Sequence, residues 1–462
     1  MRAIVLLLSA VLCISCATAL PPALSNVRNE CRQLVDQRKL PSIAIAVAKD
    51  GRIIWKEAFG ATTDTMYTLA STGKSVTGTA LLVAAKKGII DLDAPVRNYV
   101  PDLRVYEGDP NKVTIRALAS MDAGIPHLWW HHWRDVPETP LSNAEIVRRY
   151  GIVTFPPNGE MHYSNLTFGV LAQAIENASR MPFGEFLRVH VFEPLRLNHT
   201  SLHPLPQYER FLPKHPSYWY SDPEGGAGYR ASIDDLIRYA MFHLGNEVRG
   251  QQQIVDRAVL AAVHDPAKLS YRFGWGVIQD AGGPVTEIAN GGIVGGASVI
   301  RLVPSANLAV AVLSNQPGRT VDSVADHVIA AFVPEFRGEF VVPPQFDRVA
   351  YAAEPEWVGT WSGEIRTWES ATPVQITFTR DGGATMRVDR GPDVKLSGLA
   401  RENGSVVATC ACTVALSDTK GEPSKLNLEL RRDGNRVYGS AKLVSTGPRT
   451  NFSLPAYIAL AR

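Results

Sequence analysis

A change in residue pattern near Phe340 constrains the fold of this 462-residue chain more than any other feature of its sequence. Before it, residues 23–338 mix short β-rich runs with longer stretches whose apolar residues recur at helical spacing. After it, residues 356–462 alternate apolar and polar side chains between glycine-containing turns, as consecutive β-hairpins do. The sequence therefore predicts a unit of helices and strands, a linker over residues 339–355, and an all-β unit.

The first unit carries clear signals for both kinds of element. Asp50-Gly51 separates two strand-like runs and predicts a hairpin. The spacing of apolar residues predicts three helices, and β-rich runs return near the end of the unit. The expected strands are 43–47, 53–56, 297–303 and 308–313, and the expected helices are 71–88, 166–178 and 234–244.

The second unit reads as a small up-and-down β-barrel. Runs 374–378 and 384–388 flank Asp381-Gly382-Gly383, and runs 426–430 and 437–443 flank Asp433-Gly434-Asn435. No group of residues with catalytic chemistry occurs in it, so its expected role is to stabilise or shield the first unit.

Residues 1–19 have the pattern of a signal peptide. Arg2 precedes an apolar run from Ile4 to Ile14, and Ala17-Thr18-Ala19 forms an A-x-A cleavage site. We therefore expect a periplasmic or secreted bacterial protein. Two alternatives are a retained membrane anchor, for which the run is short, and a lipoprotein signal at Cys16, which Cys13 makes less favourable.

Charge and cysteine content exclude several classes of function. The formal net charge of +2 gives no electrostatic case for binding nucleic acid or an anionic membrane. After cleavage three cysteines remain, Cys31, Cys410 and Cys412, and the last two would point the same way on a strand and pack. No spacing typical of a zinc site occurs, so we expect neither a metal nor another cofactor.

Ser71 and Lys74 form an S-x-x-K pair at the start of an expected helix. Residues three apart lie on one helix face, so the hydroxyl and the amine can touch. Such a pair can serve as a nucleophile with its own base. Taken alone, the pair is also compatible with a helix cap followed by a solvated lysine.

Two further segments carry possible partners for Ser71. Tyr163, followed two positions later by Asn165, offers a proton-transferring phenol and an amide for binding a substrate. The run Asn290–Gly296 contains four glycines, which let another backbone or a ligand approach a strand closely. Read alone, the first could be a loop with a packed tyrosine and the second a flexible turn.

A third segment, Trp129-Trp130-His131-His132-Trp133, follows His127. Its aromatic residues suggest a loop that forms the wall or lid of a cleft. A metal site is an alternative, but the spacing of the histidines is irregular.

An ordered series of segments resembles the serine β-lactamase-related family, which includes class C β-lactamases, penicillin-binding carboxypeptidases, D-aminopeptidases and esterases. The series runs over about residues 25–316. It comprises LPSIA at 40–44, ASTGK at 70–74, LDAPV at 92–96, TIRAL at 114–118, YSN at 163–165, FEPLRL at 192–197, GAGYRAS at 226–232, FGWG at 273–276 and VLSN at 312–315.

The resemblance implies an α+β fold, with an antiparallel sheet flanked by helices and a helical lobe inserted between its strands. The C-terminal unit looks like the lipocalin-like barrels that some members append. The resemblance also implies roles for residues: Ser71 as the acylated nucleophile, Lys74 as its base or relay, Tyr163 as the acid and base, and Asn165 as a substrate ligand. The oxyanion hole would be formed by the backbone N–H groups of Ser71 and Ile293.

One departure from the family pattern bears on the substrate. Asn290, Gly291 and Gly292 stand where the family usually has K-T-G or H-x-G. Without the cation, a charge-assisted contact with a substrate carboxylate is lost. Esters, amides or uncharged peptide derivatives then fit better than β-lactams or D-Ala-D-Ala, although Arg301 could replace the missing charge.

The sequence therefore predicts an exported serine hydrolase acting on a small-molecule or peptide substrate, closer to an esterase or D-aminopeptidase than to a D-Ala-D-Ala carboxypeptidase. A true class C-like β-lactamase and a non-catalytic cell-wall or ligand-binding protein of the same fold are the alternatives.

Overall fold

The computed structural model describes most of the chain. The expected signal peptide and Val342-Pro343-Pro344 of the expected linker lie outside the described residues. The described residues are 20–133, 141–157, 160–202, 218–220, 223–265, 270–339, 348–447 and 450–462.

A seven-stranded antiparallel sheet forms the centre of the first unit, in the order β10-β11-β12-β13-β14-β1-β2. Its central strands are apolar at nearly every position because both faces are covered. The strands are β1 Ile43–Lys49, β2 Arg52–Phe59, β10 Tyr271–Arg272, β11 Trp275–Gln279, β12 Val285–Ile293, β13 Gly296–Val303 and β14 Leu308–Ser314.

The two faces of this sheet pack against different helices. Helices α1 (Ser25–Asp36) and α9 (Thr320–Phe332) cover one face. Val299 and Val303 of β13 point to this face and pack against them. Helices α2 (Gly73–Lys86) and α7 (Ile233–His243) lie on the other, on the side of Ile300 and Leu302. Residue parity along a strand therefore decides which layer a side chain enters.

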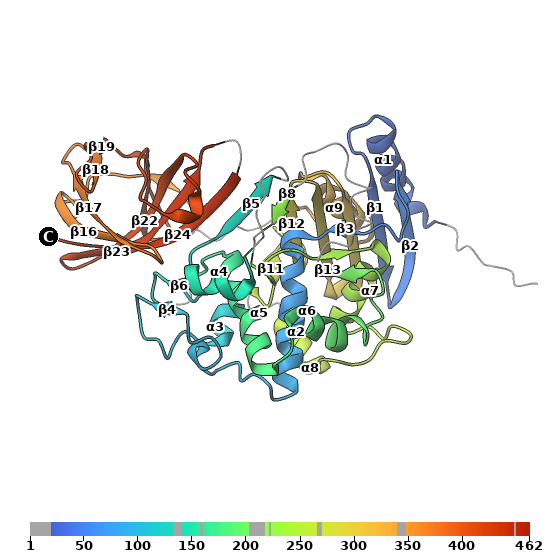
Figure 1. Cartoon of the computed structure of the whole chain (residues 1–462). Coiled ribbons are helices and arrows are strands. Elements are labelled where there is room, and N and C mark those ends of the chain that lie inside the picture. The colour runs from blue at the N-terminus through green and yellow to red at the C-terminus, as the bar shows by residue number, and fades with distance from the viewer. Residues whose placement is uncertain are drawn as a thin grey trace, which may run out of the picture.

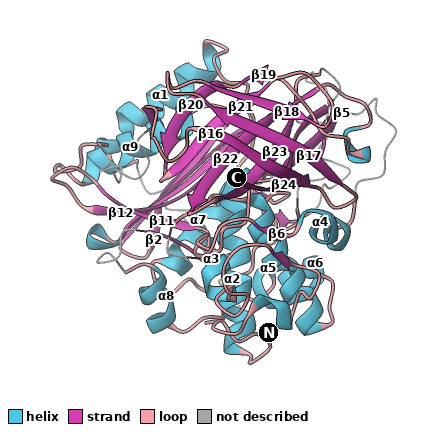
Figure 2. Ribbon diagram, turned by 90° about the vertical axis from the view of Figure 1, so that its left-hand side faces the viewer, coloured by secondary structure: helices cyan, strands magenta, loops and turns pink. Residues whose placement is uncertain are grey.

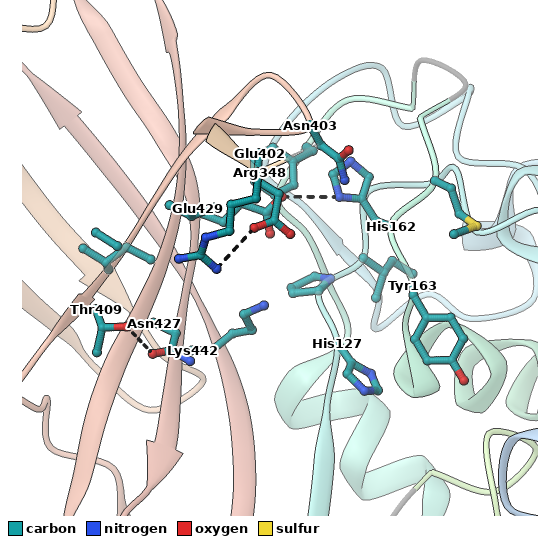
Figure 3. Close-up of a pocket in the computed structure, with 17 residues that line it drawn as sticks. His127, His162, Tyr163, Arg348, Glu402, Asn403, Thr409, Asn427, Glu429 and Lys442 are labelled. Atoms are coloured by element: carbon teal, nitrogen blue, oxygen red, sulfur yellow. Dashed lines mark hydrogen bonds and ion pairs between the residues drawn. The ribbon is translucent and has the colours of Figure 1, made fainter. Parts of the chain in front are cut away.

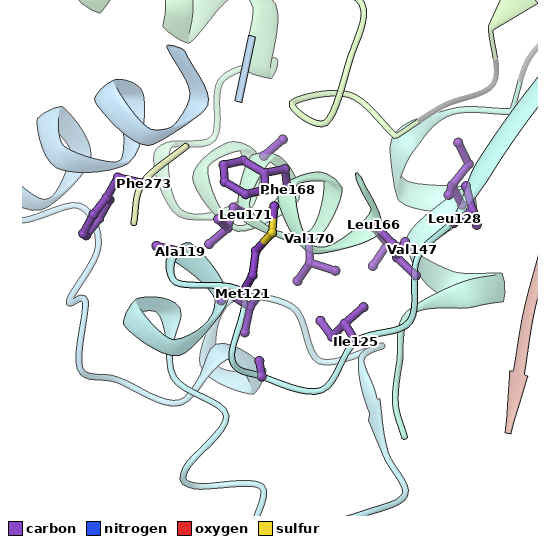
Figure 4. Packing of buried hydrophobic residues seen from close by; sticks show 14 of the residues in the cluster. Ala119, Met121, Ile125, Leu128, Val147, Leu166, Phe168, Val170, Leu171 and Phe273 are labelled. Atoms are coloured by element: carbon purple, nitrogen blue, oxygen red, sulfur yellow. The ribbon is translucent and has the colours of Figure 1, made fainter. Parts of the chain in front are cut away.

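A helical lobe occupies the chain between β2 and β10 and packs on α2 (Figure 1). Apolar side chains around α5 form its core, as Figure 4 shows for Leu166, Phe168 and Leu171. The lobe and its surroundings contain α3 Ile115–Ala119, α4 Asn143–Tyr150, α5 Asn165–Ser179, α6 Phe183–Leu187 and α8 Arg257–Val263, with short strands β3 Tyr67–Thr68, β4 Arg104–Val105, β5 Trp129–Trp133, β6 Ile152–Val153, β7 Thr200–Ser201, β8 Tyr218–Tyr220 and β9 Arg230–Ala231.

The C-terminal strands form a second antiparallel sheet that curls into a half-barrel (Figure 2). Trp357 and Trp361 are buried in its hydrophobic core. Its order is β15-β20-β21-β22-β23-β24-β16-β17-β18-β19. The strands are β15 Val349–Ala350, β16 Gly359–Arg366, β17 Ala371–Phe378, β18 Ala384–Val388, β19 Val394–Lys395, β20 Ser397–Glu402, β21 Ser405–Cys410, β22 Ser424–Asp433, β23 Arg436–Ser445 and β24 Thr450–Ala461.

Together these features confirm the expected fold class: an antiparallel sheet flanked by helices, a helical lobe, and an all-β part that follows. The position of the domain boundaries stays a prediction.

Two local expectations were wrong. The aromatic segment Trp129–Trp133 is strand β5, not a loop, because the edge of β24 and strand β8 provide backbone partners for it. Cys410 and Cys412 do not simply pack side by side but form a disulfide. Strand β21 ends at Cys410, so the chain leaves the extended conformation that would keep the two sulfurs apart.

Two expected absences concern only the described part of the chain. No helix there is long and apolar enough to cross a membrane. No cluster of three or more histidine, cysteine or acidic side chains that could hold a metal occurs among these residues either.

Candidate active site

Ser71 lies in a tight turn that leads into helix α2. Ala70, directly before it, has a φ of +46°, a left-handed conformation that a non-glycine residue rarely adopts. Residues Ala70–Thr72 form a single 3-10 turn, and α2 begins at Gly73. The strained turn places Ser71 at the N-terminal end of a helix, where backbone N–H groups can stabilise developing negative charge.

Lys74 lies one turn further along and is fully buried. Its Nζ donates to the Oγ of Ser71 at 2.9 Å and to the carbonyl oxygen of Gly226 at 2.7 Å. The helix thus brings the S-x-x-K pair into contact, and the second hydrogen bond holds the lysine head group beside the Ser71 hydroxyl.

Tyr163 reaches the same hydroxyl from the helical lobe. It precedes α5, where the Ser164 side chain caps the helix by accepting from the N–H of Thr167. The phenol of Tyr163 donates to Ser71 Oγ at 2.7 Å, and Lys74 Nζ lies 5.0 Å from the centre of its ring. Two side chains able to transfer protons therefore converge on one oxygen, and one of them, Tyr163, lies 92 residues from Ser71 along the chain.

Asn165 is the first residue of α5 and lines the same pocket. Its backbone N–H donates to Nδ1 of His127 at 3.0 Å. This neutral His127 ring carries its proton on Nε2, because Nδ1 accepts. The buried Oδ1 of Asn165 has no hydrogen-bond partner within the described structure, so it can accept from a bound N–H group.

The glycine-rich strand β12 passes directly beside Ser71. A Cβ at Gly291 would come within 3.0 Å of the Leu69 carbonyl oxygen and of the Ser71 nitrogen, whereas one at Gly292 would meet nothing within 4 Å. The pairing of β12 with β11 stops at Ile288, so residues 289–293 have no strand partner on that edge among the residues that the structure describes. Gly292 and Ile293 line the pocket of Ser71 at this edge.

The side chain of Asn290 is not brought to Ser71. Along β12 the even-numbered residues face α9, and the Asn290 amide donates to Asp322 of that helix at 3.3 Å. Arg301 of β13 also faces α9, where it pairs with Asp326 at 3.2 Å. Neither residue supplies the cation that the family usually has beside the nucleophile.

We call the cavity around Ser71 the catalytic pocket. It is lined by Ser71, Tyr163, Asn165, Gly292 and Ile293 and by residues that sequence reasoning did not assign to the site: His127, Trp129, His131 and Asn451. The aromatic segment signalled a cleft wall, and Trp129 and His131 do line the pocket. Nothing in the sequence signals Asn451, which comes from β24 and accepts from Trp129 Nε1 at 3.2 Å.

Comparison with known proteins places the first unit in a family. The family model described as Beta-lactamase matches residues 27–333. Protein flp of Staphylococcus aureus (strain MW2) is 24% identical over 326 residues, which are 63% of this chain and 62% of that protein. A beta-lactamase of Escherichia coli (strain K12) is 27% identical over 255 residues, or 50% of this chain and 64% of that protein. The matched region thus spans less than two thirds of either relative.

Solved structures of other proteins resemble nearly the whole molecule. The octameric penicillin-binding protein homologue from Pyrococcus abyssi covers 93% of this chain and 99% of its own, with a TM-score of 0.56 and 18% identity, which shows a shared fold. The family model alone covers well over half of the 462 residues. The chain therefore belongs to the beta-lactamase family of serine hydrolases.

Proposed function

We propose that the protein is an exported serine hydrolase that forms an acyl-enzyme at Ser71 and cleaves an ester, amide or peptide bond. The observation that carries the proposal is the convergence of Lys74 Nζ and the Tyr163 hydroxyl on Ser71 Oγ, at 2.9 and 2.7 Å. A serine becomes a useful nucleophile when an adjacent group removes its proton, and here two groups are in range.

Acylation begins when Ser71 Oγ bonds to the substrate carbonyl carbon. The Oγ proton passes to whichever of Tyr163 and Lys74 is deprotonated, as phenolate or neutral amine, since both groups lie within hydrogen-bond distance of Oγ. Tyr163 then protonates the leaving alcohol or amine as the bond to the carbonyl carbon breaks. In deacylation a water takes the place of the leaving group, gives a proton to Tyr163 and releases Ser71 with its proton restored.

The surroundings of Ser71 favour a substrate that carries an N–H group. The unpartnered Oδ1 of Asn165 accepts from such a group, and the open edge of residues 289–293 can pair with an extended chain. We assign the oxyanion hole to the N–H groups of Ser71 and Ile293, as the family resemblance implies. Both residues line the catalytic pocket.

The charge of the pocket argues against a compact β-lactam as the preferred substrate. Among the described residues that line it, none is a lysine or arginine. A carboxylate close to the scissile bond would therefore lack a charge-assisted partner there. Esters and amino-acid or peptide amides fit the pocket better.

A substrate panel tests this proposal. Purified protein is offered p-nitrophenyl esters, D-amino-acid amides and nitrocefin. We expect turnover of the first two classes to exceed that of nitrocefin. Ser71→Ala should abolish turnover, and Tyr163→Phe should lower kcat by about 10²- to 10⁴-fold because a general acid and base is lost.

Ser75→Ala is the matched control, because this serine lies on the same helix and its hydroxyl donates to the Thr72 carbonyl oxygen instead. Full activity in Ser71→Ala would overturn the proposed nucleophile. Nitrocefin as the best substrate of the panel would overturn the proposed preference.

A further inference from the structure

A second cavity, of about 390 Å³, lies between the first unit and the C-terminal sheet. His127 and Tyr163 line both this cavity and the catalytic pocket, so the two spaces adjoin. In Figure 3 the Tyr163 hydroxyl points away from the second cavity, whereas the opposite wall is formed by side chains of the C-terminal strands. We call this space the distal cavity.

The wall on the side of the C-terminal sheet is polar for a reason visible in the strand register. Asn427 pairs with Lys442, and Glu429 lies two residues further along β22, so all three share one face. Leu426 and Leu428 point to the other face and are buried in the half-barrel core. Alternation along β22 therefore aims a polar row at the first unit.

The distal cavity is lined by charged side chains of both signs, and not all of them are paired. Arg348 pairs with Glu402 at 3.5 Å, and His162 lies 3.7 Å from Glu429. The Lys442 side chain extends into the cavity, and its ammonium group makes no hydrogen bond or ion pair with any residue that the structure describes (Figure 3). Burial lowers the pKa of His162, and beside a neutral ring Glu429 has no charged partner. The positive and negative side chains of the cavity therefore balance in number, but Lys442 is the cation that no carboxylate engages and that a bound anion can reach.

Two polar atoms of the cavity wall also lack partners. The side chain of His162 is 9% exposed, and its buried Nε2 has no hydrogen bond within the described structure. The buried Oδ1 of Asn403 has none either. A buried donor or acceptor without a partner is costly, so these atoms and Lys442 together favour a polar ligand with an anionic group.

We propose that the distal cavity is a second subsite of the hydrolase, which binds the far, peptide-like part of an extended substrate and holds a carboxylate there through Lys442. The inference rests on the proposed function, since it places the scissile bond at Ser71. In this arrangement the cation that binds the substrate carboxylate is Lys442 in the distal cavity, and no such cation is needed beside Ser71. A compact β-lactam cannot use this charge, whereas a longer amide or ester can.

Matched substrates test the subsite. They are p-nitrophenyl esters of one to three glycines, capped at the amino end by succinyl or by butyryl, which differ only by a carboxylate in place of a methyl group. We expect wild type to prefer the succinyl ester by about tenfold in kcat/KM at one chain length, mainly through KM. Lys442→Met should bring this ratio close to one, and Lys442→Arg should keep most of it.

Lys395→Met is the control, because Lys395 is exposed on β19 of the same sheet and does not line the cavity. It should keep the preference of wild type. Absence of a preference in wild type at all three lengths, or a preference that survives in Lys442→Met, would overturn the subsite.

Failure of the proposed function would look different. Hydrolysis of both esters in Ser71→Ala would contradict the nucleophile and leave the subsite open to a direct test. In that variant, calorimetric titration with succinyl-diglycine amide and butyryl-diglycine amide measures binding alone. Tighter binding of the succinyl compound that disappears with Lys442→Met would support the subsite, and equal binding of the two compounds would overturn it.

Discussion

Ser71 Oγ receives hydrogen bonds from two side chains that differ in how far the sequence could predict them. Lys74 follows from helical spacing, because residues three apart share a face. Tyr163 does not follow from local pattern, since it lies on another element. Its residue type made it a possible partner, the ordered family segments assigned it to the site, and the structure brings its hydroxyl to 2.7 Å from Ser71.

Asn290 shows the limit of a motif at the residue scale. The glycine-rich run indicates where a strand passes the nucleophile, but a strand presents alternate side chains to opposite layers. Whether the odd- or the even-numbered side chains of β12 face Ser71 depends on how this strand packs against α9. That packing cannot be predicted from the sequence. The Asn290 amide meets Asp322 instead.

Gly291 gives the sharpest prediction at this scale. Gly291→Ala should lower kcat/KM by about 100-fold or more, because the added Cβ would strike the backbone at Leu69 and Ser71 and displace β12. Gly292→Ala should cost far less, since nothing lies within 4 Å of its added Cβ. Steady-state kinetics on the best ester of the panel compare the two variants, and equal losses would contradict the close approach.

At the scale of elements, strand β5 links the two units. It pairs with β24 on one side and with β8 on the other. Its aromatic composition fits a strand, but a strand forms only where partners exist, and these partners lie 85 or more residues away along the chain. The sequence could therefore indicate that Trp129–Trp133 forms the wall of a cleft, but not that the segment is a strand. Through β24 the C-terminal sheet places Asn451 in the catalytic pocket.

Asp418 anchors the C-terminal sheet to helix α4. Its buried carboxylate accepts hydrogen bonds from Arg149 and Tyr150 of that helix and, at 2.9 Å, from Trp368. Asp418→Asn should lower the free energy of unfolding by about 3 kcal/mol, because it leaves Arg149 partly buried with a weakened partner.

The control for this effect is Asp393→Asn, which removes an exposed pair with Arg387 on the same sheet and should cost at most about 1 kcal/mol. Urea unfolding followed by fluorescence measures both variants. Equal losses in the two would show that the α4 contact adds no more than a surface ion pair.

The disulfide between Cys410 and Cys412 should add little to stability. It closes a loop of only three residues, so by chain entropy Cys412→Ser costs about 1.6 kcal/mol. Thermal unfolding of this variant measures the cost. A loss several times larger would show that the disulfide maintains local packing as well.

At the scale of the whole molecule, the pattern change near Phe340 was enough to predict helices and strands followed by an all-β part. Hydrophobic periodicity carries that information because it is local. The way the two parts meet is not local. It depends on hydrogen bonds between distant residues, such as those of Glu107 with Arg436 and Tyr457, and on the polar outer face of β22. The distal cavity could therefore not be predicted from sequence.

Stability should fall as the solution is made acidic. Burial lowers the pKa of His243, which is fully enclosed, well below its usual value, and burial also lowers the pKa of His162. Below about pH 6.5 the unfolded chain binds protons at these residues that the folded chain does not. Each should then cost up to about 1.4 kcal/mol per pH unit.

Urea unfolding at pH 7.5, 6.5 and 5.5 checks this sign. The free energy of unfolding should change little between the first two values and drop between the last two. A stability that is constant or rises on acidification to pH 5.5 would contradict the neutral burial of these rings.

The most direct test of the account is covalent labelling of Ser71. Intact protein is treated with a fluorophosphonate probe, and digestion with mass spectrometry locates the adduct. We expect one adduct on the peptide that contains Ser71, and none in Ser71→Ala, because Lys74 and Tyr163 activate this hydroxyl alone. Absence of labelling together with absence of ester hydrolysis, or an adduct on another serine, would contradict the central claim that this chain is a serine hydrolase acting through Ser71.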